Sequence, residues 1–118
     1  MTVEFFVPFP GSALSPNARG HWSKKAKAAK AYRNECGWTA KCAGIGKIDA
    51  QTLDVSMTFF PPSKRRYDLD NLIARMKPGL DGIADVVGID DSRWTLSASK
   101  ASPVLKQGMV KIELSWSA

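Results

Sequence analysis

The sequence has few residues of the kinds that bind soft metals or form disulfides. It contains one histidine and two cysteines, Cys36 and Cys42, among 118 residues. The cysteines are six positions apart in a segment of helical composition, which puts them on different faces of a helix, and no Cys-x-x-Cys pair is present. A zinc site is therefore not expected. We expect instead two buried free thiols in a reducing compartment.

Long apolar runs and a secretory leader are also missing. No stretch is long and apolar enough to cross a membrane. The first residues, MTVEFFVPFPGS, have no basic segment and carry an early acid, Glu4. These absences predict a cytoplasmic protein with no membrane partner. Because the chain has no repeat, low-complexity tract or linker, we expect one domain spanning residues 1–118.

Acidic residues are scarce outside one stretch. The chain has 17 Lys or Arg against 11 Asp or Glu, with a formal net charge of +6 and a pI of about 9.6. Six of the eleven acids lie between Arg65 and Trp94, whereas the segment from Arg19 to Lys47 carries eight Lys or Arg and one Glu. Such a balance favours a polyanionic partner, although a solvated basic surface has the same composition.

Hydrophobic periodicity predicts the element order β-α-β-α-β-β. Alternating apolar and polar residues indicate strands over 3–7, 51–60, 94–99 and 109–116. Apolar residues three or four apart, or Ala and Lys in excess, indicate helices over 23–44 and 71–87. This order predicts an α+β fold in which a mixed sheet has helices packed on one face. The last connection contains Pro103 and Gly108, which is a hairpin signal.

Capping and breaking residues set the expected ends of the helices. Ser23 is a candidate N-cap for the first helix, and Asp70 or Asn71 for the second. We expect Pro78 to kink the second helix, because it removes a backbone donor, and Gly88 to end it.

The aromatic residues and the loop from Gly11 to Trp22 allow two interpretations each. Three tryptophans are expected in the core or at an interface, with a wedge into DNA as the alternative: Trp38, Trp94 and Trp116. In the loop, Asn17 has turn chemistry and Trp22 is a candidate core anchor. The functional alternative is that the loop lies beside the acidic stretch and touches substrate.

Asp68, Asp70 and Asp91 are the candidate metal ligands. Residues two apart in extended backbone point the same way, so Asp68 and Asp70 share a face before the second helix. The loop after that helix presents Asp90 and Asp91, and it could return to the same junction. Converging carboxylates need a cation, and hard oxygen ligands suit Mg²⁺ or Mn²⁺. Helix capping is the alternative explanation for the Asp-x-Asp pair.

Several polar and basic residues are candidate DNA contacts. They are Asn17, Arg19, His21, Lys24, Lys27, Lys30, Lys64, Arg65 and Arg66. Lys24, Lys27 and Lys30 can form a stripe on the first helix, and the lack of matching acids favours phosphate contact over a merely solvated face.

At the acidic residues the sequence resembles the RusA family of Holliday junction resolvases. The run Asp68-Leu69-Asp70-Asn71-Leu72, a helix, and then Ile89-Asp90-Asp91 is similar to that family's signature. The strand end and the following Ser15-Pro16-Asn17 and His21-Trp22 are similar to its N-terminal pattern. The likeness extends over nearly the whole chain.

The resemblance implies a homodimer from a bacterium or prophage that works in DNA recombination and repair. It implies a magnesium-dependent endonuclease that cuts four-way DNA junctions symmetrically, with metal-ligand roles for Asp68, Asp70 and Asp91 and a less certain one for Asp90. A four-way junction is nearly two-fold symmetric, so an isologous dimer can present two sites to two strands. A non-catalytic basic DNA-binding module and a nuclease for other branched DNA are the competing functions.

One position departs from the family pattern. The family has a catalytic lysine four residues after the second Asp of the motif, and Ala74 stands there in this chain. Arg75 and Lys77 are the nearest cations, and Lys77 lies closer to the face of Ala74 on a helix. Either cation could stabilise charge that develops on the phosphate, and we expect Lys77 to contribute more.

Overall fold

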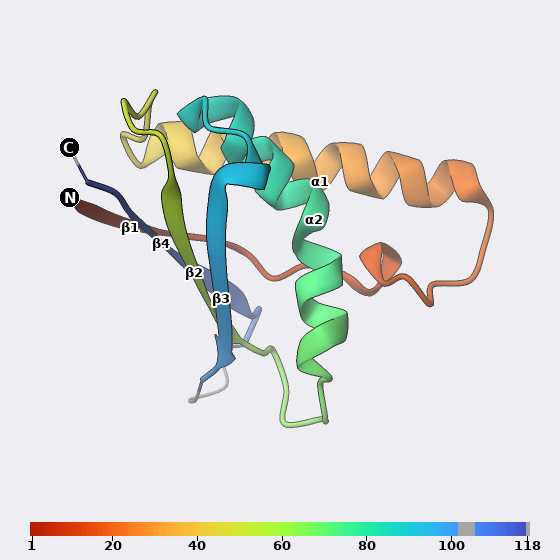
Figure 1. Ribbon diagram of the computed structural model, residues 1–118. Coiled ribbons are helices and arrows are strands. Elements are labelled where there is room, and N and C mark those ends of the chain that lie inside the picture. Colours follow the sequence, from red (N-terminus) through yellow and green to blue (C-terminus); the bar gives the residue numbers. More distant parts are fainter. Residues whose placement is uncertain (102–105, 118) are drawn as a thin grey trace.

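Four strands form one mixed sheet, and two helices cover one of its faces (Figure 1). The computed structural model describes residues 1–101 and 106–117. Its elements are β1 (Thr2–Pro8), η1 (Ser12–Leu14), α1 (Trp22–Cys42), β2 (Leu53–Phe60), α2 (Leu69–Val87), η2 (Asp91–Arg93), β3 (Trp94–Lys100) and β4 (Met109–Ser115). The predicted α+β class and the predicted element order are both confirmed.

The strands lie in the order β1-β4-β2-β3. β4 is antiparallel to both of its neighbours, whereas β2 and β3 are parallel and are joined by α2 as a crossover helix. The expected hairpin between the last two strands is therefore wrong, because β2 separates β3 from β4. Of the connection that suggested it, residues 102–105 lie outside the described residues.

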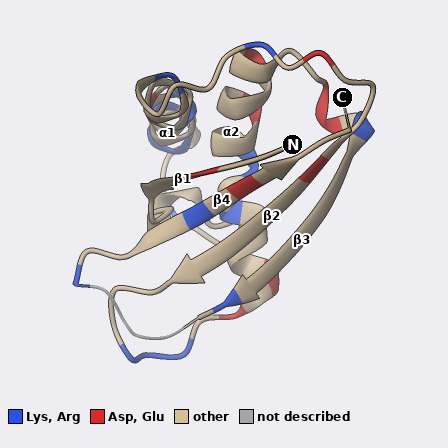
Figure 2. Ribbon diagram, turned by 90° about the vertical axis from the view of Figure 1, so that its left-hand side faces the viewer, with Lys and Arg blue, Asp and Glu red and all other residues tan. Residues whose placement is uncertain are grey.

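The core lies between the sheet and the two helices. β2 alternates as its sequence predicts, and its four inward side chains are each at most 1% exposed: Leu53, Val55, Met57 and Phe59. Its outward side chains lie on the face that no helix covers (Figure 2). The inward faces of β1, β2 and β4 supply the strand part of this hydrophobic core, whereas β3 contributes only the partly buried Trp94 and Ala98.

α1 and α2 cross at glycines that let the two backbones approach closely. A Cβ atom built on Gly82 would lie 2.1 Å from the carbonyl oxygen of Arg33, and one on Gly37 would lie 3.2 Å from the carbonyl oxygen of Gly82. The Tyr32 hydroxyl beside this crossing donates a hydrogen bond to the carbonyl oxygen of Pro8, 2.6 Å away. Burial raises the pKa of the Cys36 thiol, one turn further on, to about 12.

Both helices begin earlier than the sequence predicts. α1 begins at Trp22, and the His21 ring nitrogen Nδ1 accepts a hydrogen bond from the Ser23 amide at 3.2 Å, so His21 rather than Ser23 is the N-cap. α2 begins at Leu69 with Asp68 in the N-cap position, so Asp70 and Asn71 are not caps. Leu69 lies three residues before Leu72 and packs against the core with it, which extends α2 back to Leu69.

The remaining helix signals behave as expected. Gly88 ends α2 in the left-handed conformation, with φ of 76°. α2 continues through Pro78, and its axis changes direction about midway along the helix (Figure 1). No helix in the described part of the chain is long and apolar enough to span a membrane.

Two predictions about buried side chains are wrong. Cys42 is exposed, so only Cys36 is a buried thiol. Trp22 is 75% exposed and does not anchor the core. Trp38 is 68% exposed as well, which removes it from the core, whereas Trp94 and Trp116 are half-buried against it.

Candidate functional site

Asp68 and Asp70 lie exposed at the start of α2. Asp68 occupies the N-cap position, but its side chain makes no capping hydrogen bond, and Asp70 lies in the first turn. Capping by its carboxylate is therefore not what Asp68 does in this structure. Both carboxylates remain open to solvent, which leaves their oxygens available for a cation.

The N-terminal loop is bound to the same end of α2. The Asn71 side-chain amide donates to the Ser15 hydroxyl oxygen at 2.8 Å, and the Arg75 Nε donates to the Asn71 side-chain oxygen at 2.8 Å. Arg75 Nη1 also donates to the carbonyl oxygen of Pro10 at 3.3 Å. These bonds hold residues 10–15 beside Asp70, the arrangement expected if the loop lies next to the acidic residues.

Ser15 is the polar residue of this network that the sequence did not single out. It is 8% exposed, and its hydroxyl oxygen also accepts from the Asn17 amide at 3.2 Å. A serine before a proline in a turn-rich loop is too common to mark a role by itself. Its only earlier signal was its place in the Ser15-Pro16-Asn17 run.

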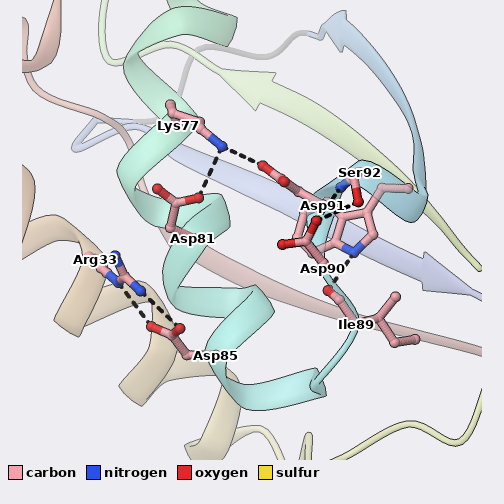
Figure 3. Close-up of polar contacts among 9 residues, drawn as sticks. Arg33, Lys77, Asp81, Asp85, Ile89, Asp90, Asp91 and Ser92 are labelled. Atoms are coloured by element: carbon pink, nitrogen blue, oxygen red, sulfur yellow. Dashed lines mark hydrogen bonds and ion pairs between the residues drawn. The ribbon is translucent and has the colours of Figure 1, made fainter.

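Asp91 contacts the middle of α2 rather than its start. Its carboxylate accepts a hydrogen bond from the Lys77 ammonium, which also donates to Asp81 Oδ1 at 3.1 Å (Figure 3). The contacts with Asp91 and then with Asp81 raise the pKa of Lys77. Of the two candidate cations, Lys77 therefore faces Asp91, while Arg75 is turned toward the N-terminal loop.

Asp90 has a structural task. Its carboxylate accepts hydrogen bonds from the hydroxyl and the amide of Ser92 (Figure 3). Asp90 is thereby the N-cap of η2. Those two bonds lower the pKa of Asp90. The indole Nε1 of Trp94 donates to the carbonyl oxygen of Ile89 at 3.0 Å and fixes the same turn. The turn presents Asp91 toward α2 while Asp90 serves the backbone.

Helix geometry relates Asp70 to the Lys77–Asp91 pair. Asp70, Ala74 and Lys77 are four and three residues apart, so they lie along one face of α2. At about 1.5 Å per residue, Asp70 and Lys77 are roughly 10 Å apart along the helix. No three His, Cys, Asp or Glu side chains in the described residues form a group that could hold a metal. The structure thus brings Asp91 to the face that begins at Asp70 but gathers no three-carboxylate cage.

The donor chemistry is nevertheless of the kind that Mg²⁺ and Mn²⁺ use. Mg²⁺ commonly takes one or two protein carboxylates and completes its shell with waters and substrate phosphate oxygens. Asp68 and Asp70 at the helix start, or Asp91 with Lys77 displaced, meet that requirement. The residues present therefore fit an open, solvent-rich cation site better than a closed one.

A hollow of about 300 Å³ separates α2 from β3 at this place. It is lined by Ile73, Ala74, Lys77, Leu80, Asp91, Trp94 and Leu96. Ala74, which stands where the resemblance would put a lysine, is in its wall. The small side chain leaves the space open, and Lys77 one turn later is the cation that borders it.

The candidate DNA-contacting residues lie in three exposed places. Arg19, His21 and Lys24 line a hollow of about 370 Å³ beside η1. Lys27 and Lys30 follow along α1 and are exposed, and Figure 2 shows that this helix carries several basic residues. The segment 64–66 precedes Asp68, and the Arg65 guanidinium lies 5.5 Å from the centre of the Tyr67 ring. Within residues 1–101 and 106–117, no ion pair neutralises these cations.

The chain is similar to an uncharacterized protein of Xylella fastidiosa. The two sequences are 39% identical over 111 residues, which cover 92% of this chain and 72% of the Xylella protein. No protein-family model matches the sequence.

Proposed function

This chain belongs to the same protein family as the Xylella protein, and from its own residues we propose that it is a metal-dependent endonuclease that cuts four-way DNA junctions. The observation that carries the proposal is the contact between Lys77 and Asp91. It joins the second acidic segment to the face of α2 that starts at Asp70, so one exposed surface holds carboxylates and a cation. Phosphodiester hydrolysis needs both.

In this proposal the carboxylates and the cation have separate tasks. Asp68 and Asp70, joined by Asp91 once Lys77 releases it, would hold Mg²⁺ or Mn²⁺, which when bound would supply charge neutralisation at the phosphate and activation of water. Lys77 orients Asp91 before substrate arrives. When phosphate enters, its ammonium stabilises the negative charge that builds up on the non-bridging oxygens.

Arg75 and Asp90 act as positioning residues. Arg75 holds Asn71 and the carbonyl of Pro10, and so fixes the N-terminal loop against the start of α2. Asp90 holds the η2 turn that presents its neighbour. Neither side chain has to touch the scissile phosphate for the site to work.

The basic surfaces account for substrate binding. The cations of α1 and of residues 64–66 precede Asp68 and Asp70 in the sequence, and phosphate contacts from such cations supply most of the affinity for a DNA backbone. A homodimer would supply two equivalent sites, which matches the near two-fold symmetry of a four-way junction.

The test is cleavage of an end-labelled synthetic four-way junction with Mg²⁺, with Mn²⁺ and with EDTA. We expect paired, symmetric cuts with either metal and none with EDTA. Matched linear duplex, flap and three-way DNA are the controls for structure selectivity. Cutting of flap or three-way DNA in preference to the junction would replace the proposal with a nuclease for other branched DNA.

A non-catalytic DNA-binding module is a second candidate, and one observation favours it. The described residues gather no group of three carboxylates that could hold a metal. For this candidate, junction binding would persist in EDTA with unchanged affinity, and no cut would appear at any concentration of Mg²⁺ or Mn²⁺.

A further inference from the structure

The outer face of α1 carries a tryptophan near the C-terminal end of a row of lysines. At about 100° per residue, Trp38 lies only about 20° around the helix from Lys27, and Lys41 about 40° on the other side. Lys24 and Lys30 lie about 60° on either side of Lys27. All of these side chains are exposed, and Trp38 is 68% so.

This face points directly away from the core. Cys36, which is fully buried, lies about 180° around α1 from Lys27. The one acid of α1, Glu35, lies about 80° to the side. None of the four lysines has an ion-pair partner among the residues that the structure describes. The lysine–tryptophan face is thus cationic, unneutralised and free of any packing task.

The ring of Trp38 borders open space. A hollow of about 170 Å³ beside it is lined in part by Asn34, Gly37 and Lys41 of α1 and by Gly82 of α2. The ion pair of Arg33 with Asp85 lines the same hollow. A flat group that stacks on the indole therefore has room beside it, with the Lys41 ammonium close by.

We propose that the lysine–tryptophan face of α1 binds an unpaired DNA strand, with one base stacked on Trp38 and the phosphates along Lys24, Lys27, Lys30 and Lys41. A cationic track interleaved with an aromatic ring is how proteins bind single strands without sequence preference. In a duplex the base faces are covered by their neighbours, so the tryptophan selects the unpaired bases found at strand exchanges and branch points.

A second copy of the chain is the competing occupant, and charge argues against it. An isologous contact would place the same lysines of two copies against one another, and like charges at an interface cost several kcal/mol. A polyanion gains from the same charges through release of its counterions. The inference rests on the proposed function only in taking DNA as the polyanion.

The test compares two labelled DNAs of one sequence, an unpaired strand and its blunt duplex, in EDTA so that cleavage plays no part. We expect Trp38→Ala to weaken strand binding by about tenfold or more, the range for loss of one base–aromatic stack, and to leave duplex binding nearly unchanged. Trp38→Phe should retain most of the affinity. Phe6→Ala, which removes an aromatic that is 44% exposed on the uncovered sheet face, is the matched control.

Salt dependence separates the ring from the lysines. For single strands, each lost phosphate contact lowers the slope of log K against log salt by about 0.7, so Lys27→Gln with Lys41→Gln should lower it by about 1.4. Trp38→Ala should leave the slope unchanged, because the indole carries no charge. Lys47→Gln, a lysine beyond α1, is the control for the charge change.

Three results would overturn the inference. They are no loss of strand affinity in Trp38→Ala, an equal loss on strand and duplex, or conversion of a dimer to a monomer by Trp38→Ala in analytical ultracentrifugation. If the protein binds single strands through Trp38 but cuts no junction, only the proposed nuclease activity is contradicted. If it cuts junctions and Trp38→Ala does not change strand binding, only this inference is contradicted.

Discussion

The two flanks of α2 are built in opposite ways. Toward α1 the helix meets its neighbour backbone to backbone, with Gly82 against Gly37 and no room for a methyl group. Toward β3 it leaves a hollow of about 300 Å³, bordered by Lys77 and by Asp91 from the turn before that strand. Glycines close the flank toward α1, whereas the flank toward β3 stays open between Lys77 and Asp91.

The difference separates what the helix needs for stability from what it can offer to a ligand. The contact of Gly82 with Gly37 offers no side chain to a ligand, so a substitution there acts through folding. On the open flank, side chains such as Lys77 are solvated and can be replaced without disturbing the core. Stability and activity should therefore respond to different sets of substitutions in a single helix.

The largest effect is expected on the open flank. Asp70→Asn should lower the rate of Mg²⁺-dependent junction cleavage by about a thousandfold, because a lost metal ligand removes several kcal/mol of transition-state stabilisation. Junction binding should persist or tighten, since one charge that repels phosphate is gone. The measurement is single-turnover cleavage with a parallel binding titration, and Asp54→Asn on the uncovered sheet face is the control. Undiminished cutting would take Asp70 out of the site.

The next effect distinguishes the two cations of α2. Lys77→Ala should lower kcat at saturating junction by about a hundredfold and leave binding nearly intact, as for a group that acts on the transition state. Arg75→Ala should have a smaller effect on kcat and a larger one on the melting temperature, since it frees Asn71 and Pro10. A greater rate loss for Arg75→Ala would reverse the two roles.

On the closed flank the expected effect is on folding. Gly82→Ala should lower the free energy of unfolding by about 1–3 kcal/mol or more, because the new methyl group would lie 2.1 Å from a carbonyl oxygen and force α1 and α2 apart. Urea unfolding measures the change. Gly46→Ala, where a Cβ would meet nothing within 4 Å, is the matched control. Equal stability of the two variants would mean that the helices do not cross this closely.

The smallest effect tests a charge pair at the rim of the closed flank. Arg33 Nε and Nη2 donate to the Asp85 carboxylate at 2.9 Å each, and that contact lowers the pKa of Asp85 below its ordinary value of 3.8 (Figure 3). A carboxyl with a lowered pKa stabilises the fold above 3.8 and loses this contribution as pH falls through the lowered value. Asp85→Asn should therefore melt slightly earlier than wild type at pH 7.

That difference should shrink to nothing in strong acid. Both side chains of the pair are about half exposed, so the effect at pH 7 should also be smaller in concentrated salt. Melting curves of both proteins from pH 7 to pH 2 make the comparison. A difference that persists below the lowered pKa would show that Asp85 stabilises the crossing by packing rather than by charge.

Local sequence patterns predicted the helices and strands well, but they predicted poorly which strands pair with one another. The alternation of β2 and the glycine at the end of α2 act over a few residues, and the structure has both as expected. The hairpin signal near Gly108 was equally local, yet β4 pairs with β1 and β2, which are distant in the sequence. Pairing of that kind depends on which apolar faces the finished core must cover, and no turn residue encodes it.

The candidate site shows the same limit. The acids were visible as an excess in a basic chain, but the contact of Asp91 with Lys77 depends on how far α2 runs back along the sheet. The glycines of α2 did not reveal in the sequence that α1 and α2 cross there, because a lone glycine in a helix indicates only low helix propensity. Trp22 is exposed against expectation, and of the places predicted for Trp38 its exposure rules out the core, since hydrophobicity alone does not tell a core residue from one that contacts a partner.

The place of β4 in the sheet has a consequence for the order of events in folding. β1 and β2 have no direct pairing. β2 can pair with β3 earlier, but β1 finds its neighbour only when residues 109–115 arrive. A nascent chain that already contains both helices and three strands still holds β1 without its neighbour, and loop closure over about a hundred residues must precede that pairing. The sheet is thus completed in its middle by the last of its four strands in chain order, and until then the unpaired edges of β1 and β2 are a hazard for aggregation.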